Sequence, residues 1–136
     1  EMLERETEQI LIFESGKKVF GLELDRVDSI AEKDSITSVP NVPPAAEGIL
    51  FYRDRILPVF NLLKMLHGNN DGCGNLLVVV RGLSEDFGIS SDRIYGIMPV
   101  EQLKLRHIPP EERENPYIQG NGEFNGTEFF LLDFKI

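Results

Sequence analysis

The sequence FGLELDRVDSI at residues 20–30 returns 67 residues later as FGISSDRIYGI at residues 87–97. Both stretches carry the same Phe, Gly, Asp and Arg and end in the same Ile. In the first copy Phe20, Leu22 and Leu24 alternate with other residues, so they share one face of a β-strand. The pattern indicates an internal repeat made of short strands.

Further matches between the two halves follow in the same order. Val39-Pro40 corresponds to Ile108-Pro109, Gly48 to Gly120, and VFNL at 59–62 to LLDF at 131–134. A repeat of about 70 residues is the size of one small barrel, which buries too little apolar area to be stable alone. We therefore expect an all-β fold of two small five-stranded β-barrel subdomains packed together, with short helical turns. The expected domain covers residues 8–136, with subdomains at about 8–67 and 76–136; strand exchange between them stays open.

Apolar runs separated by turn formers predict about ten short strands. We expect them at residues 10–13, 19–24, 27–30, 49–52, 56–60, 76–80, 87–89, 94–98, 117–118 and 128–134. Helical turns are predicted at 62–67 and after Pro110, and loops at 68–75 and 107–115. Gly16-Lys17 and Gly120-Asn121-Gly122 are typical of hairpin turns, and Arg53-Asp54-Arg55 is predicted to form a hairpin tip.

Composition and charge narrow the class of protein. The chain is 41% hydrophobic and 27% charged, as in ordinary globular proteins. No apolar run reaches the roughly 18 residues of a membrane-spanning helix, and residues 1–10 are too charged for a signal peptide. We therefore expect a cytoplasmic protein without membrane insertion. The net charge of −9 disfavours nucleic acid and anionic membranes, so proteins are the expected partners.

The residues suited to metal binding or nucleophilic chemistry are few. His67, Cys73 and His107 stand far apart in the sequence, without C-x-x-C or H-x-x-x-H spacing. We predict no catalytic residue, no metal and no cofactor. A barrel enzyme would need a convergent cluster of such groups, which this sequence does not show. A small-barrel nucleic-acid binder would need a basic, aromatic groove, and the net charge of −9 argues against one.

Four motifs in the first half occur in a recognisable order. They are Gly21-x-x-x-Asp25-x-Val27-x-x-Ile30, then Pro40-Asn41-x-Pro43, Gly48-Ile49-Leu50-x-x-Arg53 and Pro58-Val59-x-Asn61-Leu62. This order resembles the CheW-like domain, whose middle part usually reads P-N-x-P…G-V-x-N-L-R-G-x-I-x-P-V-x-D-L. The second half continues the likeness with Gly88-x-x-x-Asp92-x-Ile94 and Tyr117-Ile118-x-Gly120. The sequence departs from the pattern at Phe51 (usually Asn), Asp54 (usually Gly) and Asn61 (usually Asp).

The resemblance implies a non-catalytic adaptor with a groove between two barrels. Members of the family bridge the cytoplasmic tips of methyl-accepting chemoreceptors to a CheA-type histidine kinase. Carried over to this sequence, the resemblance implies receptor-binding residues Arg53, Asp54, Asn41 and Gly48, and kinase-binding residues Val27, Ser29 and Ile30. Period-2 alternation places Val27 and Ser29 on one face, where we expect a small exposed apolar patch. A regulatory domain of a larger histidine kinase, or a receiver-linked adaptor, remains an alternative.

Overall fold

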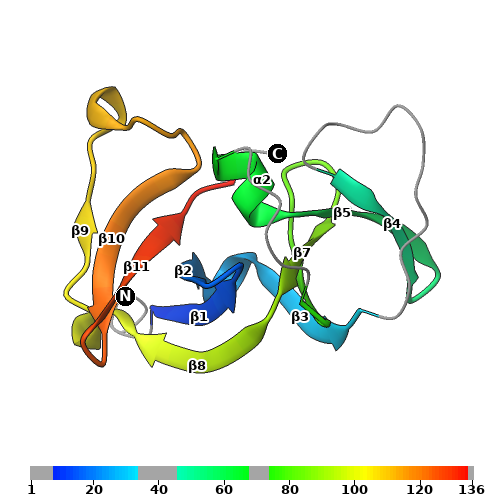
Figure 1. The fold of residues 1–136 in the computed structure, drawn as a ribbon, viewed down its shortest axis with the longest axis horizontal. Helices are drawn as coiled ribbons and strands as arrows, with labels where there is room; N and C mark the ends of the chain where they lie inside the picture. Colours follow the sequence, from blue (N-terminus) through cyan, green and yellow to red (C-terminus); the bar gives the residue numbers. More distant parts are fainter. Residues whose placement is uncertain (1–7, 34–45, 68–73, 135–136) are drawn as a thin grey trace.

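Short strands form two sheets in the computed structural model, which describes residues 8–33, 46–67 and 74–134. The sheet of lobe A has the order β8 (Arg93–Pro99), β1 (Gln9–Ser15), β2 (Lys18–Glu23), β11 (Thr127–Leu132), β10 (Ile118–Phe124) and β9 (Arg106–His107). The sheet of lobe B has the order β3 (Val27–Glu32), β6 (Leu76–Val80), β7 (Phe87–Ser91), β5 (Arg55–Phe60) and β4 (Ala46–Tyr52). Figure 1 shows the lobes side by side, with helix α2 (Leu62–His67) above the junction. The all-β prediction is confirmed.

The two predicted subdomains are present as packed lobes, but their sheets are open rather than closed into five-stranded barrels. Lobe A has six strands with edges at β8 and β9, and lobe B has edges at β3 and β4. In lobe B these edges approach each other through side chains. Lys33 Nζ lies 3.3 Å from Glu47 Oε1, and Ser29 Oγ lies 2.9 Å from Tyr52 Oη. Side-chain contacts thus join the edges where a closed barrel would have a backbone ladder.

The register confirms the internal repeat. β2 pairs in parallel with β11 through Gly21 and Leu131, and β7 pairs in parallel with β5 through Gly88 and Val59. These are the residues that the sequence alignment of the two halves matched. The chain leaves lobe A after β2 and returns to it after β7. Each half of the sequence therefore contributes strands to both lobes, which is the strand exchange that the sequence left open.

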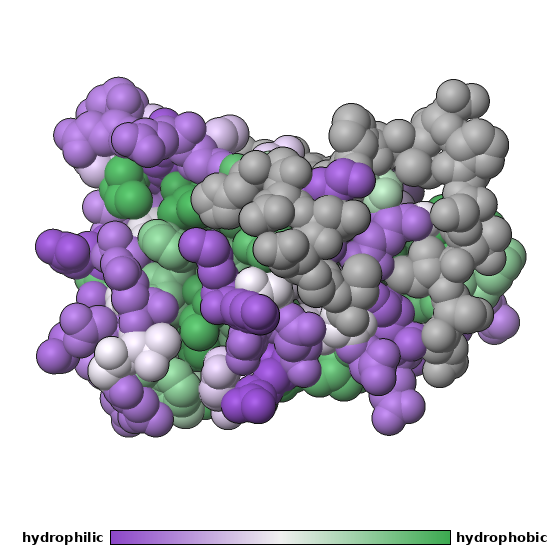
Figure 2. Space-filling model, in the orientation of Figure 1, coloured by the Kyte–Doolittle hydropathy of each residue, from purple (hydrophilic) through white to green (hydrophobic). Residues whose placement is uncertain are grey.

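Three apolar cores account for the long apolar runs. A central core lies between the sheets, and each lobe has a smaller core of its own. In β1, Leu11 and Phe13 enter the central core, whereas Ile10 and Ile12 enter the core of lobe A. A strand buried on both faces favours apolar residues at successive positions. The face in Figure 2 is largely hydrophilic, with apolar side chains visible mainly over the lobe A half.

The predicted turn at Gly120-Asn121-Gly122 is wrong, because these residues lie inside β10. A Cβ atom at Gly120 would stand 2.4 Å from the carbonyl oxygen of Arg106, and one at Gly122 would stand 2.6 Å from that of Leu103. Glycine is therefore needed here for close approach of two backbones rather than for a turn. The approaching segment includes β9, whose second residue, His107, was predicted to begin a loop. The hairpin turn lies instead at Asn125-Gly126.

Helix α2 is short and capped. The side chain of Asn61 accepts a hydrogen bond from the backbone N–H of Lys64 at 3.0 Å, as expected at a helix N-terminus. In the part of the chain that the structure describes, no helix is both long and apolar enough to cross a membrane.

Two equivalent hairpin turns differ in their residues. Arg53 and Asp54 have φ angles of 50° and 65°, and Asn125 and Gly126 have φ angles of 50° and 80°. A two-residue turn with positive φ at both positions favours Asn-Gly, because side chains with a Cβ are strained in the left-handed region. The β4–β5 turn therefore carries strain that the β10–β11 turn avoids.

We predict that Asp54→Gly raises the free energy of unfolding by about 0.5–1 kcal/mol, because glycine relieves the left-handed strain. Urea denaturation followed by circular dichroism measures the change. Gly126→Asp at the equivalent turn is the matched control and should lower stability by a similar amount. An unchanged or lower unfolding midpoint for Asp54→Gly would contradict the turn assignment.

Glu23 is a half-buried carboxyl group at the end of β2. Burial raises its pKa above the usual value, and the negative charges of Asp25, Glu8 and Asp133 raise it further. A hydrogen bond with the Gln119 side chain partly opposes these effects. The folded state therefore holds the Glu23 proton more tightly than the unfolded state. Stability falls as the pH rises through and above the usual glutamate range.

We predict that Glu23→Gln raises stability at neutral pH by less than about 1 kcal/mol, because no buried charge then has to form. The gain should vanish in acid, where Glu23 is protonated in both states. Denaturation curves at several pH values measure this, with Glu128→Gln on an exposed strand position as control. A gain that is the same in acid and at neutral pH would disprove the ionisation argument.

Candidate interaction site

The β4–β5 hairpin exposes an apolar pair close to its tip. Phe51 and Ile56 face each other across the two strands, with 72% and 53% of their surfaces exposed. The next pair, Leu50 and Leu57, points inward and is buried in the core of lobe B. An exposed aromatic–aliphatic pair beside a turn is suited to protein contact.

Two guanidinium groups approach one tyrosine ring in this hairpin. The guanidinium carbon of Arg53 lies 5.0 Å from the centre of the Tyr52 ring, and that of Arg55 lies 5.9 Å from it. Both distances fit cation–π contacts. The Tyr52 hydroxyl is hydrogen-bonded to the Ser29 hydroxyl of β3. The ring thus links the predicted receptor-binding hairpin to the predicted kinase-binding strand.

The two arginines differ in their ionic partners. Arg55 pairs with Asp28 at 3.2 Å and also with Asp86, which ties the hairpin to β3 and to the loop before β7. Asp28 also lies 3.8 Å from Arg81. Among the described residues, Arg53 makes no ion pair, and its contact is with the Tyr52 ring. The exposed guanidinium of Arg53 therefore keeps hydrogen-bond donors accessible at the surface.

Strand β3 presents a different apolar residue from the one predicted. Val27 is half-buried and packs against the central core, whereas Ile30 is 42% exposed. The cause is a register shift between Val27 and Ser29, which breaks the period-2 alternation. The expected surface patch of Val27 with Ser29 is therefore wrong, and Ile30 is the exposed aliphatic side chain of this strand.

The other predicted site residues lie in different environments. Asp54 is exposed beside Arg53 at the hairpin turn. Gly48 is buried in β4, with a φ of 151°, next to a register shift between Ala46 and Gly48. It shapes the strand and offers no exposed surface. Asn41 lies outside the described residues.

Most of the hairpin site was not predicted from the sequence. Phe51 was noted as a strand residue and as a departure from the family pattern, and Ile56 as a strand residue, although an inward Leu50 makes its neighbour Phe51 face outward. Asp28, Arg55 and Asp86 are distant in sequence, so no local pattern joins them.

A second exposed apolar group lies on the edge strand β8. Tyr95 and Ile97 are 38% and 47% exposed, and the Tyr95 ring lies 5.8 Å from that of Phe124. The Tyr95 hydroxyl donates a hydrogen bond of 2.9 Å to the carboxylate of Glu14, and this bond raises the pKa of Tyr95. The Arg93 guanidinium lies 5.7 Å from the centre of the same ring.

No group of three or more His, Cys, Asp and Glu side chains within residues 8–33, 46–67 and 74–134 is placed to hold a metal ion. His107 is exposed in β9, and Cys73 lies outside the described residues.

Comparisons with known proteins agree on one family. The model of the CheW-like domain matches residues 9–135. The chemotaxis protein CheW of Thermotoga maritima is 30% identical over 126 residues, which cover 92% of this chain and 83% of that protein. The chemotaxis protein CheW of Treponema pallidum is 26% identical over 107 residues, covering 74% and 63% respectively.

A solved structure has the same fold. The scaffolding protein TtCheW from Thermoanaerobacter tengcongensis superposes with a TM-score of 0.81 at 22% identity, covering 95% of this chain and 86% of that one. At this identity the likeness concerns the fold alone, whereas the family match spans nearly the whole sequence. The chain therefore belongs to the CheW-like domain family.

Proposed function

We propose that this chain is a non-catalytic scaffolding adaptor of bacterial chemosensory signalling. It couples the cytoplasmic tips of chemoreceptors to a CheA-type histidine kinase in the cytoplasm. Membership of the CheW-like family supports the class of function. The observation that carries the proposal for this chain is the braced hairpin, which presents Phe51, Ile56 and the exposed guanidinium of Arg53.

Scaffolding of this kind acts through geometry. An adaptor that binds two proteins at once raises the effective concentration of each for the other. The hairpin is held in place by the Asp28–Arg55–Asp86 ion pairs and by the Ser29–Tyr52 hydrogen bond. A preorganised surface loses less conformational freedom on binding, so its few contacts yield more affinity.

The proposed receptor surface is the tip of the β4–β5 hairpin, with Arg53 and Asp54 as contact residues. Arg53 combines several donors with a planar apolar face, a combination found often at interface hot spots. Gly48 supports this surface through the shape of β4. For Asn41 a receptor contact rests on the family resemblance.

The proposed kinase surface is the exposed edge of β3. Ile30 supplies an accessible aliphatic side chain, Ser29 fixes the strand to Tyr52, and Val27 supports it from the core side. Because Ser29 and Tyr52 are hydrogen-bonded, the two proposed surfaces adjoin each other. The adaptor would then hold the receptor tip and the kinase domain close together.

We predict that Arg53→Glu weakens binding to a receptor cytoplasmic fragment about tenfold, because one hot-spot cation becomes an anion. Pull-down and titration with the fragment measure the loss. Lys17→Glu is the matched control, since Lys17 is also an exposed cation with positive φ in a hairpin turn. Equal receptor affinity of the wild type and Arg53→Glu would remove the hairpin from the receptor interface.

We predict that Ile30→Asp lowers affinity for the regulatory domain of the kinase by about 2 kcal/mol, or thirtyfold, because a charge replaces a buried aliphatic contact. Receptor binding of Ile30→Asp should persist. The two variants are thus controls for each other, because Arg53→Glu should affect receptor binding and Ile30→Asp kinase binding. Val27→Asp is expected to weaken kinase binding too, but it also reaches the central core. Thermal melting therefore accompanies each variant. A folded Ile30→Asp protein with wild-type kinase affinity would refute the β3 surface.

A further inference from the structure

A pocket of about 420 Å³ lies where α2 meets lobe A, away from the hairpin and β3. Its wall and floor contain five apolar side chains: Phe20, Leu66, Ile108, Ile118 and Phe130. The rings of Phe20 and Phe130 lie 6.5 Å apart. This volume is within the range of binding pockets, and it is large enough for several apolar side chains.

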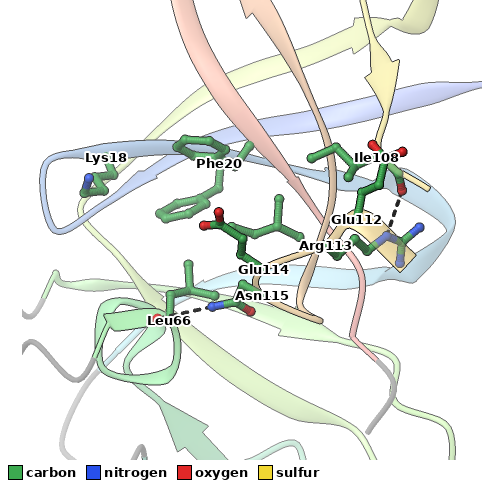
Figure 3. A pocket seen from close by; sticks show the side chains of 10 residues that line it. Lys18, Phe20, Leu66, Ile108, Glu112, Arg113, Glu114 and Asn115 are labelled. Atoms are coloured by element: carbon green, nitrogen blue, oxygen red, sulfur yellow. Dashed lines mark hydrogen bonds between the residues drawn. The ribbon is translucent and has the colours of Figure 1, made fainter. Parts of the chain in front are cut away.

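Hydrogen bonds from the side chains of Arg113 and Asn115 to backbone carbonyl groups hold one wall of the pocket in place. Arg113 donates from Nε to the carbonyl oxygen of Ile108 at 2.9 Å and lies 3.4 Å from Asp133. Asn115 donates to the carbonyl oxygen of Leu66 at 3.2 Å, which joins the wall to α2. Figure 3 shows both bonds beside the pocket. The shape of the pocket is therefore fixed without a ligand.

The residues that alternate with Arg113 and Asn115 along this wall, Glu112 and Glu114, are charged and exposed. Glu112 and Glu114 line the pocket from the segment before β10, and Lys18 lines it from β2; Figure 3 shows Glu114 between Glu112 and Lys18. Within residues 8–33, 46–67 and 74–134, none of these three makes an ion pair. Two unpaired carboxylates at an apolar pocket favour a ligand that is apolar in the middle and cationic at one side.

The topology decides between an extended and a helical ligand. β2 and β11, which form the floor, are interior strands of the sheet and pair with neighbours on both sides. Where they line the pocket, Phe20 of β2 and Phe130 of β11 are paired with each other, which leaves little edge for an added strand. An α-helix satisfies its own backbone hydrogen bonds and therefore suits this pocket better than an extended peptide.

From these observations we propose that the pocket binds an amphipathic helix of another protein, with its apolar face on Phe20, Ile118 and Phe130. Basic side chains of that helix pair with Glu112 and Glu114. Lys18 repels a cation at the opposite side and so sets the direction of the helix. The site would add a third docking surface to the two proposed above, and it does not depend on either.

The test uses a fluorescein-labelled helical peptide of about 14 residues, with Leu on one face and Lys on the other. Anisotropy with the full chain should show binding with a dissociation constant below about 100 µM. A peptide with Gln in place of Leu should bind at least about tenfold more weakly, because it keeps the charge but loses the apolar face. Absence of binding at that concentration, or equal binding of both peptides, would overturn the proposal.

Protein variants separate this site from general attraction to an acidic surface. The double variant Glu112→Lys/Glu114→Lys should weaken binding about tenfold. Glu101→Lys/Glu111→Lys makes the same change of charge at exposed positions outside the pocket, and it should alter affinity less than twofold. Ile108→Ser tests the apolar wall at a residue that belongs to none of the three cores, and it should also weaken binding. Equal losses in the two charge variants would overturn the proposal.

Methyl NMR then locates the bound peptide. Shifts at Leu66, Ile108 and Ile118 are expected in the wild type. Shifts confined to Ile56 and Ile30 would place the peptide on the other surfaces and would refute this pocket as its site.

Discussion

The burial of strands on both of their faces is the constraint from which the rest of this fold follows. β1 and β6 each lie between the central core and the core of one lobe, so their residues are apolar in succession: ILIF at 10–13 and LLVVV at 76–80. Val78 and Val80 face the central core, while Leu77 and Val79 face lobe B. Neither sheet can bury its inner face except against the other, and the lobes are therefore stable only together.

The repeated residues acquire physical meaning from this arrangement. Phe20 and Phe87 both enter the central core. A Cβ at Gly21 would stand 2.8 Å from the Phe129 ring, and one at Gly88 would stand 2.6 Å from Leu77, so glycine lets these side chains pack closely against both strands. The repeated Asp-Arg lies where the chain crosses between lobes. There the Arg26 guanidinium donates hydrogen bonds to the carbonyl oxygens of Arg81 and Phe134. The Asp92 carboxylate accepts a hydrogen bond from the backbone N–H of Gly16.

These relations set how much the sequence could predict. Strand content, the Gly16-Lys17 turn and the repeat depend on local patterns, and the structure has them. The open edges of the sheets and the role of Gly120 and Gly122 depend on which segments, distant in the sequence, pack against each other. Local sequence patterns do not indicate such contacts. The face of Val27 was predicted from strict alternation, which a register shift beside Asp28 interrupts. Arg53 could be selected from the sequence because it matches the arginine of the family motif. The exposure of Phe51 and Ile56 could be predicted only once the inward face of their strands was known.

The fold leaves few places where an adaptor can meet its partners, because three cores occupy the inner faces. The edge strands β3 and β8 hold equivalent positions in the two sheets. The last residue of the repeat, Ile30 in β3 and Ile97 in β8, is exposed in both, at 42% and 47%. A partner that recognises only this aliphatic side chain would meet it on both edges. Discrimination must come from the neighbours: the exposed carboxylate of Glu32 follows Ile30 two residues later, whereas Ile97 lies between Tyr95 and Pro99. The repeat thus supplies two similar edges, and the residues that differ between its copies make the edges distinct.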